Sequence, residues 1–160
     1  MSRLVKRSMW GGALAATAAG LLAISSVGKD EGLRLKAYRD VVGIPTICRG
    51  ETLGVKMGDT HTKEQCEAMF LRRLDEFAGK VEHCVKKPMS DRTLVAFTSM
   101  AYNVGVGGFC GSTTVRLYNA GDFAGACRAM GYWNKAGGRV IPGLTARRAR
   151  ETALCLEGLK

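Results

Sequence analysis

Residues 31–46 read Glu31-Gly-Leu-Arg-Leu-Lys-Ala-Tyr-Arg-Asp40-Val-Val-Gly-Ile-Pro-Thr46. Two carboxylates lie nine positions apart here, and a threonine follows six positions later. Gly43 and Pro45 interrupt regular structure before a short apolar run over 44–48. We therefore expect Glu31 near the end of a helix and Asp40 on a strand or hairpin.

The residues between the two carboxylates indicate a change of structure within this stretch. Leu33, Ala37 and Tyr38 follow Glu31 at helical or turn spacing. Carboxylates on two different elements can face each other across a cleft, with one kept protonated to donate to a leaving oxygen and the other ionised. Glycosidic bonds are hydrolysed by such a pair, although two acids at this spacing also occur on solvated faces. From the spacing of Glu31 and Asp40 alone, a catalytic pair is only a hypothesis.

The complete pattern is more specific than the spacing. Glu-x8-Asp-x5-Thr, with Gly-Leu-Arg-Leu-Lys-Ala-Tyr-Arg inside it, resembles the catalytic segment of the phage-type lysozymes, glycoside hydrolase family 24. The resemblance implies that Glu31 is the general acid, that Asp40 activates water or stabilises positive charge, and that Thr46 helps to place the water. It also implies an inverting reaction without a metal or other cofactor.

The implied fold is α+β and lysozyme-like. It is mostly helical, with a small β-hairpin or sheet lobe, a long connecting helix and a helical C-terminal lobe. The resemblance covers about residues 29–157, and its motifs occur in the order found in the family. The chain length of 160 residues suits one domain with a short appendage.

The chain is strongly basic, with 24 Lys and Arg against 14 Asp and Glu, a formal charge of +10. This balance favours anionic polymers such as nucleic acid, acidic lipid or cell-wall polymer. Because no zinc-finger spacing or aromatic RNA-binding motif accompanies the charge, nucleic acid is not the expected partner. Peptidoglycan is the partner that the resemblance implies.

Six cysteines and only two histidines argue against a zinc site and against a Cys-His nucleophile. An even number of cysteines in an exported chain indicates disulfides, although buried free thiols remain the alternative. Sequence does not fix the connectivity. Our prediction joins segments that we expect to be neighbours: Cys48 with Cys66, Cys84 with Cys110, and Cys127 with Cys155.

Residues 8–28 carry no charge and follow a short basic flank. A helix of this length spans about 30 Å, enough for a bilayer core, and the flank predicts a cytoplasmic N-terminus. The segment is rich in Gly and Ala, so its insertion is only weakly favourable. We predict two regions: residues 1–28 as an N-terminal membrane helix with its flank, and residues 29–160 as the muramidase domain.

Two interpretations of this segment stay open. It can be a cleaved signal peptide, with small residues near Ala16–Ala19 for the peptidase. It also resembles the signal-anchor-release segment of some phage endolysins, which we favour because Glu31 begins only three residues after it. A dimerising membrane helix is a third, minor possibility. The favoured resemblance implies an inactive protein tethered in the host inner membrane, then a monomer released to the periplasm with the help of a holin or membrane depolarisation.

Downstream of Thr46 the chain departs from the family at one position. Many members have Gly-His-Thr where this chain has Gly50-Glu51-Thr52. The third carboxylate can raise a neighbour's pKa by repulsion or simply point to solvent, and we assign it no catalytic role. The region to Asp59 reads as a hairpin or a three-stranded lobe.

Two long helices follow. Thr62-Lys-Glu-Gln65 fits a capping box, and apolar residues then recur at spacings of three and four up to Cys84. Ser90-Asp91 caps a second helix over 94–104 that is apolar almost all round, which is typical of a central buried helix. It ends in Tyr-Asn-Val-Gly, which resembles a family signature. Asn103 is therefore either a substrate-facing residue or one that bonds the helix terminus.

The C-terminal third predicts short elements and a closing helix. A loop is expected from Gly107-Gly108, helices near 112–119 and 122–130, further loops at Gly137-Gly138 and Pro142-Gly143, and a helix from about 145 to 156. The run Gly143-Leu-Thr-Ala-Arg-Arg-Ala-Arg-Glu151 resembles the closing motif of the family, in which an arginine pairs with the catalytic acid. Arg147 is the first choice and Arg148 the second. A solvated basic face is the alternative for both.

These observations predict a peptidoglycan-hydrolysing endolysin. Two other functions remain open: a lytic transglycosylase, which cleaves the same bond without water, and a catalytically inactive wall-binding or membrane-tethered structural protein. The charge fits all three and does not discriminate among them.

Overall fold

A computed structural model describes residues 22–23, 25–29 and 31–160. The chain divides into two compact units, 1–75 and 76–160, and each is described by itself. Most of the predicted membrane segment, including residues 8–21, lies outside the described residues. Among the residues that are described, no helix is long and apolar enough to cross a membrane.

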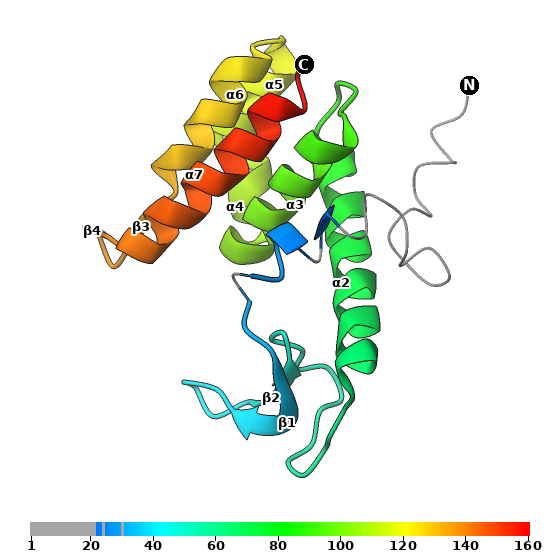
Figure 1. Ribbon diagram of the computed structural model, residues 1–160. Helices are drawn as coiled ribbons and strands as arrows, with labels where there is room; N and C mark the ends of the chain where they lie inside the picture. Colours follow the sequence, from blue (N-terminus) through cyan, green and yellow to red (C-terminus); the bar gives the residue numbers. More distant parts are fainter. Residues whose placement is uncertain (1–21, 24, 30) are drawn as a thin grey trace. The chain divides into compact units, whose positions relative to one another are not determined.

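The first unit contains an antiparallel hairpin of strands β1 (Arg34–Arg39) and β2 (Pro45–Cys48) (Figure 1). Tyr38 pairs with Thr46, so the hairpin places Thr46 beside the end of β1. Isolated bridges, Lys36 with Thr60 and Ile47 with Glu51, extend the pairing without a third strand. The spacing of Leu33, Ala37 and Tyr38 indicated a helix or a turn, and this interpretation is wrong. Residues 34–39 form a strand, because its backbone hydrogen bonds are made with β2.

The interior of the first unit is small. Ile47, Cys48 and Cys66 form its buried centre, and Leu33, Ala37, Val55 and Met69 pack against them. The disulfide Cys48–Cys66 ties β2 to helix α2 (Lys63–Cys84), which begins with the predicted capping box. In that box Gln65 N donates to Thr62 Oγ1 over 3.2 Å, and Thr62 N donates to Gln65 Oε1 over 2.8 Å. The α2 helix continues into the second unit, as predicted for the connecting helix.

The second unit is built around α3 (Asp91–Val104), whose residues 93–101 are all buried. Ser90 caps this helix as predicted, with its side chain accepting from Thr93 N. Phe97 lies 5.5 Å from Phe109 and 5.2 Å from Tyr118, measured between ring centroids. The apolar sequence of this helix thus forms the core of the unit, as expected.

Short helices surround α3: α4 (Val106–Cys110), α5 (Thr113–Ala120), α6 (Phe123–Ala129) and the 3₁₀ helix η3 (Met130–Tyr132). Helices α5 and α6 match the prediction. The loop expected from Gly107-Gly108 is wrong, because burial of Phe109 holds that segment in α4. Gly105, at φ 86°, separates α3 from α4 in a conformation that favours glycine.

The chain closes with a tight hairpin and the helix α7 (Pro142–Glu157), which packs against α3 and α6 (Figure 1). Strands β3 (Lys135–Ala136) and β4 (Arg139–Val140) join through Gly137-Gly138, both at positive φ, as two-residue hairpin turns require. The loop expected at Pro142-Gly143 is wrong. Proline is tolerated in the first turn of a helix, so α7 begins three residues earlier than predicted.

All three predicted disulfides are present: Cys48–Cys66 in the first unit, and Cys84–Cys110 and Cys127–Cys155 in the second. Cys84–Cys110 joins the end of α2 to the end of α4, and Cys127–Cys155 joins α6 to α7. None of the six cysteines is free. The alternative of buried thiols is therefore excluded.

Candidate active site

Asp40 follows the last residue of β1 and is held by the backbone of its own turn. Its Oδ1 accepts hydrogen bonds from Val42 N over 3.0 Å and from Ile44 N over 2.9 Å. The backbone closes the same turn, because Asp40 N donates to Ile44 O. Within the described residues no hydrogen bond to Oδ2 is formed, so one carboxylate oxygen is fixed and the other remains able to accept a proton from water.

The same turn fixes Thr46. This residue is 3% exposed, and its Oγ1 donates to Ile44 O over 2.9 Å. Ile44 therefore contacts both predicted residues, its N–H bonding Asp40 and its carbonyl bonding Thr46. Gly43, at φ 85°, supplies the positive φ that the turn needs, and Arg39 Nη1 donates to its carbonyl over 2.8 Å. The hairpin thus brings Asp40 and Thr46 together.

Glu31 lies in the same unit, at the bend that follows the helical residues 22–23 and 25–26. Its side chain is half-buried, and its backbone N–H donates to Gly28 O over 3.4 Å. Glu31 thus lies near the end of a helical segment, as predicted. Its role as the general acid stays a prediction.

Glu51, the departure from the family pattern, supports the turn that follows β2. Its Oε1 accepts from Thr52 N and Leu53 N, each over 2.9 Å, and its Oε2 lies 3.9 Å from Arg73 Nε. The carboxylate is therefore engaged by backbone and by a guanidinium.

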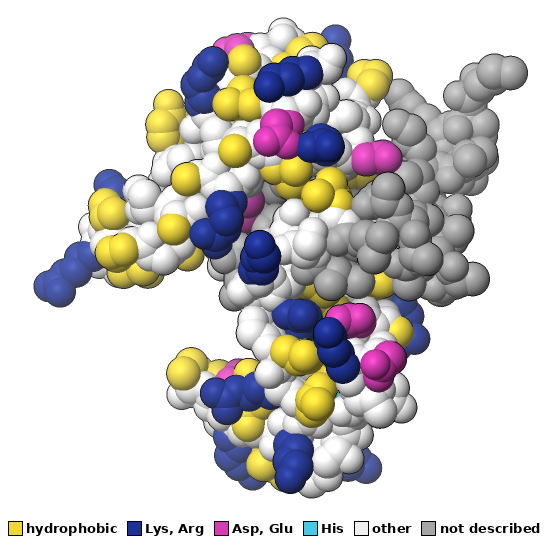
Figure 2. Space-filling model, in the orientation of Figure 1, with side chains coloured by type: hydrophobic (Ala, Val, Ile, Leu, Met, Phe, Trp, Pro, Cys, Tyr) yellow, Lys and Arg dark blue, Asp and Glu magenta, His cyan; other side chains and the backbone are white. Residues whose placement is uncertain are grey.

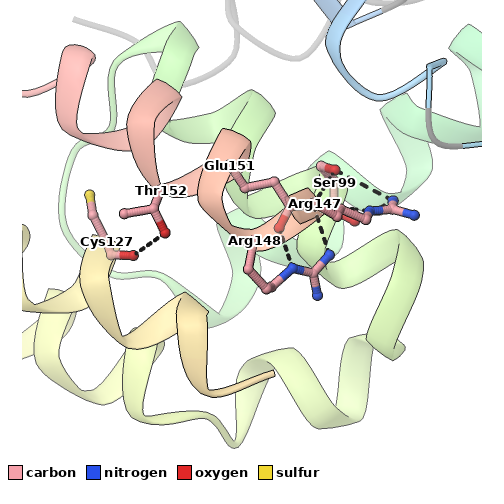
Figure 3. Close-up of polar contacts among 6 residues, drawn as sticks. All are labelled: Ser99, Cys127, Arg147, Arg148, Glu151 and Thr152. Atoms are coloured by element: carbon pink, nitrogen blue, oxygen red, sulfur yellow. Dashed lines mark hydrogen bonds and ion pairs between the residues drawn. The ribbon is translucent and has the colours of Figure 1, made fainter. Parts of the chain in front are cut away.

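Arg147 and Arg148 lie in the interior of the second unit rather than on a solvated basic face, with 5% and 1% exposure. Figure 3 shows both guanidinium groups directed toward Glu151, which is also buried. Arg147 Nε lies 3.2 Å from Glu151 Oε1, and Arg148 Nε lies 2.6 Å from Oε2. The solvated alternative is wrong for both residues.

Ser99 completes this cluster from α3. Its hydroxyl donates to Glu151 Oε1 over 2.5 Å, and its carbonyl accepts from Arg147 Nη2 over 3.3 Å. Burial raises the pKa of the Glu151 carboxyl above its ordinary value, and its partners in the cluster oppose part of that rise, Arg148 most. The cluster thus holds two guanidinium groups on one carboxylate.

Sequence reasoning missed Ser99 and Glu151. The signal for Glu151 was present, because it follows Arg147 and Arg148 at four and three positions, the spacings at which helical side chains meet. Ser99 gave no signal of its own. Asn103 lies exposed in the last turn of α3, and its part in substrate binding stays a prediction.

The surface chemistry fits an anionic partner. Figure 2 shows Lys and Arg side chains distributed over the visible face of the described residues, interspersed with hydrophobic ones. In the part of the chain that is described, no cluster of three or more His, Cys, Asp or Glu is arranged to hold a metal ion.

Comparison with known proteins gives consistent results. The phage lysozyme family model matches residues 28–151. The chain is 40% identical to the SAR-endolysin of Pseudomonas phage phiKMV over 158 residues, which is 96% of this chain and 94% of that protein. It is 39% identical to the SAR-endolysin of bacteriophage PS119, over 91% of this chain and 92% of that one.

A solved structure supports the same assignment. A variant of P22 lysozyme matches with a TM-score of 0.78 and 35% identity, over 84% of this chain and 94% of that chain. The α+β arrangement of a small antiparallel sheet, a long helix and a helical C-terminal unit is thus the lysozyme-like one. The fold predicted for this part of the chain is confirmed.

Proposed function

The chain belongs to the phage lysozyme family and is a glycoside hydrolase of the lysozyme type, and from this premise we propose how its residues divide the reaction. The substrate is the β-1,4 bond between N-acetylmuramic acid and N-acetylglucosamine in bacterial peptidoglycan. Glu31 donates a proton to the leaving oxygen, Asp40 activates the attacking water, and Thr46 helps to orient it. The observation that carries this division is the Asp40 carboxylate, with one oxygen fixed by two backbone N–H groups.

The proposed step is a single displacement with inversion. Water attacks the anomeric carbon while the glycosidic C–O bond breaks. The proton of the Glu31 carboxyl passes to the leaving oxygen, and Asp40 takes a proton from the attacking water. Held through Ile44, the Thr46 hydroxyl oxygen can accept a hydrogen bond from that water. Inversion rests on the family resemblance.

Arg147 and Arg148 have a supporting role in this proposal. The resemblance assigns one arginine of this motif to pairing with the catalytic acid, with Arg147 as the first choice. The cluster with Ser99 and Glu151 supports such a role, because it fixes the orientation of both guanidinium groups. Asn103 is proposed to contact the sugar chain.

The tether is part of the proposal. Residues 1–28 anchor the chain in the host inner membrane with the N-terminus in the cytoplasm, and residues 29–160 form the muramidase, which is inactive until released into the periplasm. The names of the phiKMV and PS119 relatives support this cycle. Burial of Ala23 and Val27 in the described structure supports a released segment that packs with the enzyme. Release is proposed to depend on a holin or on depolarisation and to yield a monomer.

The catalytic assignment is tested on purified peptidoglycan. Wild type, Glu31→Gln and Asp40→Asn are compared for release of reducing ends, with Glu157→Gln, an exposed carboxylate in the second unit, as the control. We expect each of the first two changes to lower kcat by roughly 10²–10⁴-fold, because general acid–base groups contribute about that much. Wild-type activity in Glu31→Gln contradicts the proposal.

The products separate the remaining functions. A lytic transglycosylase forms a 1,6-anhydro end and needs an acid alone, so activity retained in Asp40→Asn together with anhydro products identifies it. Tight binding to peptidoglycan without any cleavage identifies an inactive wall-binding protein. Hydrolysis that requires both carboxylates supports the muramidase.

The tether is tested in cells. The full chain is expressed in a Gram-negative host without a holin, with and without a depolarising agent, and lysis and N-terminal mass are measured. Rapid lysis on depolarisation by protein that retains residue 1 or 2 supports the released anchor. A mature protein without its first 20 or so residues replaces the anchor with a signal peptide and leaves the enzyme assignment intact.

A further inference from the structure

We propose that Arg49 is a positioning residue for Glu31, acting through the backbone carbonyl of Gly28. Arg49 Nη1 donates a hydrogen bond to Gly28 O, and the same oxygen accepts the backbone N–H of Glu31 over 3.4 Å. One carbonyl therefore joins the guanidinium to the residue proposed as the general acid. The inference rests on the proposed role of Glu31 and adds a residue outside the family motif.

The backbone turn that contains Arg49 is rigid. Arg49 lies in a turn closed by two hydrogen bonds between Ile47 and Glu51, each 2.9 Å long. The preceding residue, Cys48, has φ 59° and forms the disulfide to Cys66 on α2. A side chain that leaves such a turn has little freedom in its starting direction, so it can act as a fixed support.

The guanidinium itself is held against α2. Its central carbon lies 5.6 Å from the ring centroid of Phe70, which is buried and one helical turn beyond Cys66. A planar guanidinium can stack on an aromatic ring and still donate N–H bonds at its edge, whereas an ammonium group lacks this geometry. Arginine is therefore suited to this position in a way that lysine is not.

The other partner is the end of a short helical segment. Val27 N donates to Ala23 O over 2.9 Å, and both side chains are fully buried. Gly28 follows directly, so its carbonyl lies where helical carbonyls lack a partner within the helix and attract positive charge. Arg49 supplies that charge as a charge-assisted donor, which is stronger than a neutral one.

This geometry couples two events. When the segment that carries Val27 and Gly28 lies in the first unit, Gly28 O reaches Arg49, and the hydrogen bond from Glu31 N to the same oxygen fixes the backbone from which the acid projects. If the segment lies elsewhere, as proposed for the tethered state, Arg49 has no Gly28 carbonyl to bind and Glu31 loses this support. Arg49 is thus proposed to link docking of the released segment to assembly of the site.

The test uses the full chain with its disulfides formed and compares Arg49→Met and Arg49→Lys with wild type. Arg72→Met, an exposed arginine on α2, is the matched control. Amide hydrogen exchange is measured at Val27, Gly28 and Glu31, and kcat and KM are measured on soluble peptidoglycan fragments.

In Arg49→Met we expect exchange at these amides to rise about tenfold or more, because a charge-assisted hydrogen bond is lost. A similar fall in kcat is expected with KM changed less than about twofold, because the acid is displaced while the sugar contacts remain. Exchange along α2 should stay at the wild-type level. Arg49→Lys should fall between wild type and Arg49→Met, and Arg72→Met should match wild type.

Unchanged exchange at residues 27–31 in Arg49→Met overturns the proposal, as does raised exchange with wild-type kcat. If Arg49→Met does not fold, Arg49→Lys and Phe70→Leu, which removes the stacking surface, give the same two readouts. Failure of the proposed function has a different signature: Glu31→Gln then keeps wild-type activity, while the exchange result still reports whether Arg49 holds Gly28.

Discussion

Asp40 and Thr46 lie on a hairpin whose tip is open to solvent, whereas Arg147, Arg148 and Glu151 lie in the interior of the helical unit. Val41, next to Asp40, is fully exposed, but Arg148 is 1% exposed. Backbone N–H groups of the turn hold Asp40, and a network of charged side chains holds the arginines. A functional side chain can lie on an exposed turn when the backbone of that turn holds its orientation. Buried charged side chains, in contrast, are stable only when they are paired with one another.

This contrast has a consequence for stability. Substitutions at the hairpin tip remove little burial, so their cost should be small unless they break a tie to α2. Substitutions in the buried cluster leave a charge without its partner in the interior, which is expensive. The two regions should therefore separate loss of activity from loss of folding.

The largest effect is expected from Glu151→Gln, which removes the buried carboxylate that Arg147 and Arg148 share. Removal of one partner from a buried ion pair costs about 3–5 kcal/mol, because the remaining charge stays desolvated. Chemical denaturation of wild type and variant measures the difference. Arg92→Met is the control, since Arg92 and Glu157 form an exposed pair at 2.6 Å and such pairs contribute only about 0–1 kcal/mol. Equal losses in the two variants would contradict the contrast.

The disulfides test whether the hairpin depends on its tie to α2. The double variant Cys48→Ser with Cys66→Ser removes a disulfide between cysteines 18 positions apart. The double variant Cys127→Ser with Cys155→Ser removes one between cysteines 28 positions apart. Each pair should cost about 2–4 kcal/mol in unfolding free energy. Activity under conditions where both remain folded should fall only in the first pair, because only that bond supports the turn bearing Arg49. Equal activities would remove the tie to α2 from the catalytic argument.

A smaller change is expected at the helix caps. Thr62→Ala removes the hydroxyl that accepts from Gln65 N at the start of α2, and Ser90→Ala makes the corresponding change at α3. Each should lower stability by about 1 kcal/mol in equilibrium unfolding. The Ser90 change should cost at least as much, since its hydroxyl is part-buried and also bonds Thr93. A Thr62→Ala protein as stable as wild type would show that the capping box does not contribute.

The smallest effect is a pH dependence at Glu64. Its pKa is lowered from 4.5, because its own backbone N–H and then the Thr62 hydroxyl donate to the carboxylate. A pKa lowered on folding means stability that is present above the unfolded value and is lost as the pH falls through the folded one. Thermal unfolding of wild type and Glu64→Gln should therefore differ at pH 7 and converge in acid. A difference of the same size at both pH values would rule out this origin.

Sequence by itself determined the elements with strong local signals. The capping box at Thr62 and the periodic apolar residues predicted α2, because a 3.6-residue repeat has one way to bury its apolar face. The all-round apolar character of 94–104 predicted the central helix. The pattern from Glu31 to Thr46 indicated the family. The three disulfide pairs were predicted from expected neighbours and are present, although sequence alone does not fix the connectivity.

Only the tertiary structure decided the features that depend on contacts between distant residues. Phe109 folds the Gly107-Gly108 segment into a helix because a buried ring outweighs the low helix propensity of glycine. Arg147 and Arg148 are buried because Ser99, 48 residues earlier, and Glu151 satisfy them there. Arg49 reaches Gly28, 21 positions away, through a turn fixed by a disulfide. Local sequence encodes helices, turns and caps, but a side chain's partner is set by packing, which no single stretch of the chain contains.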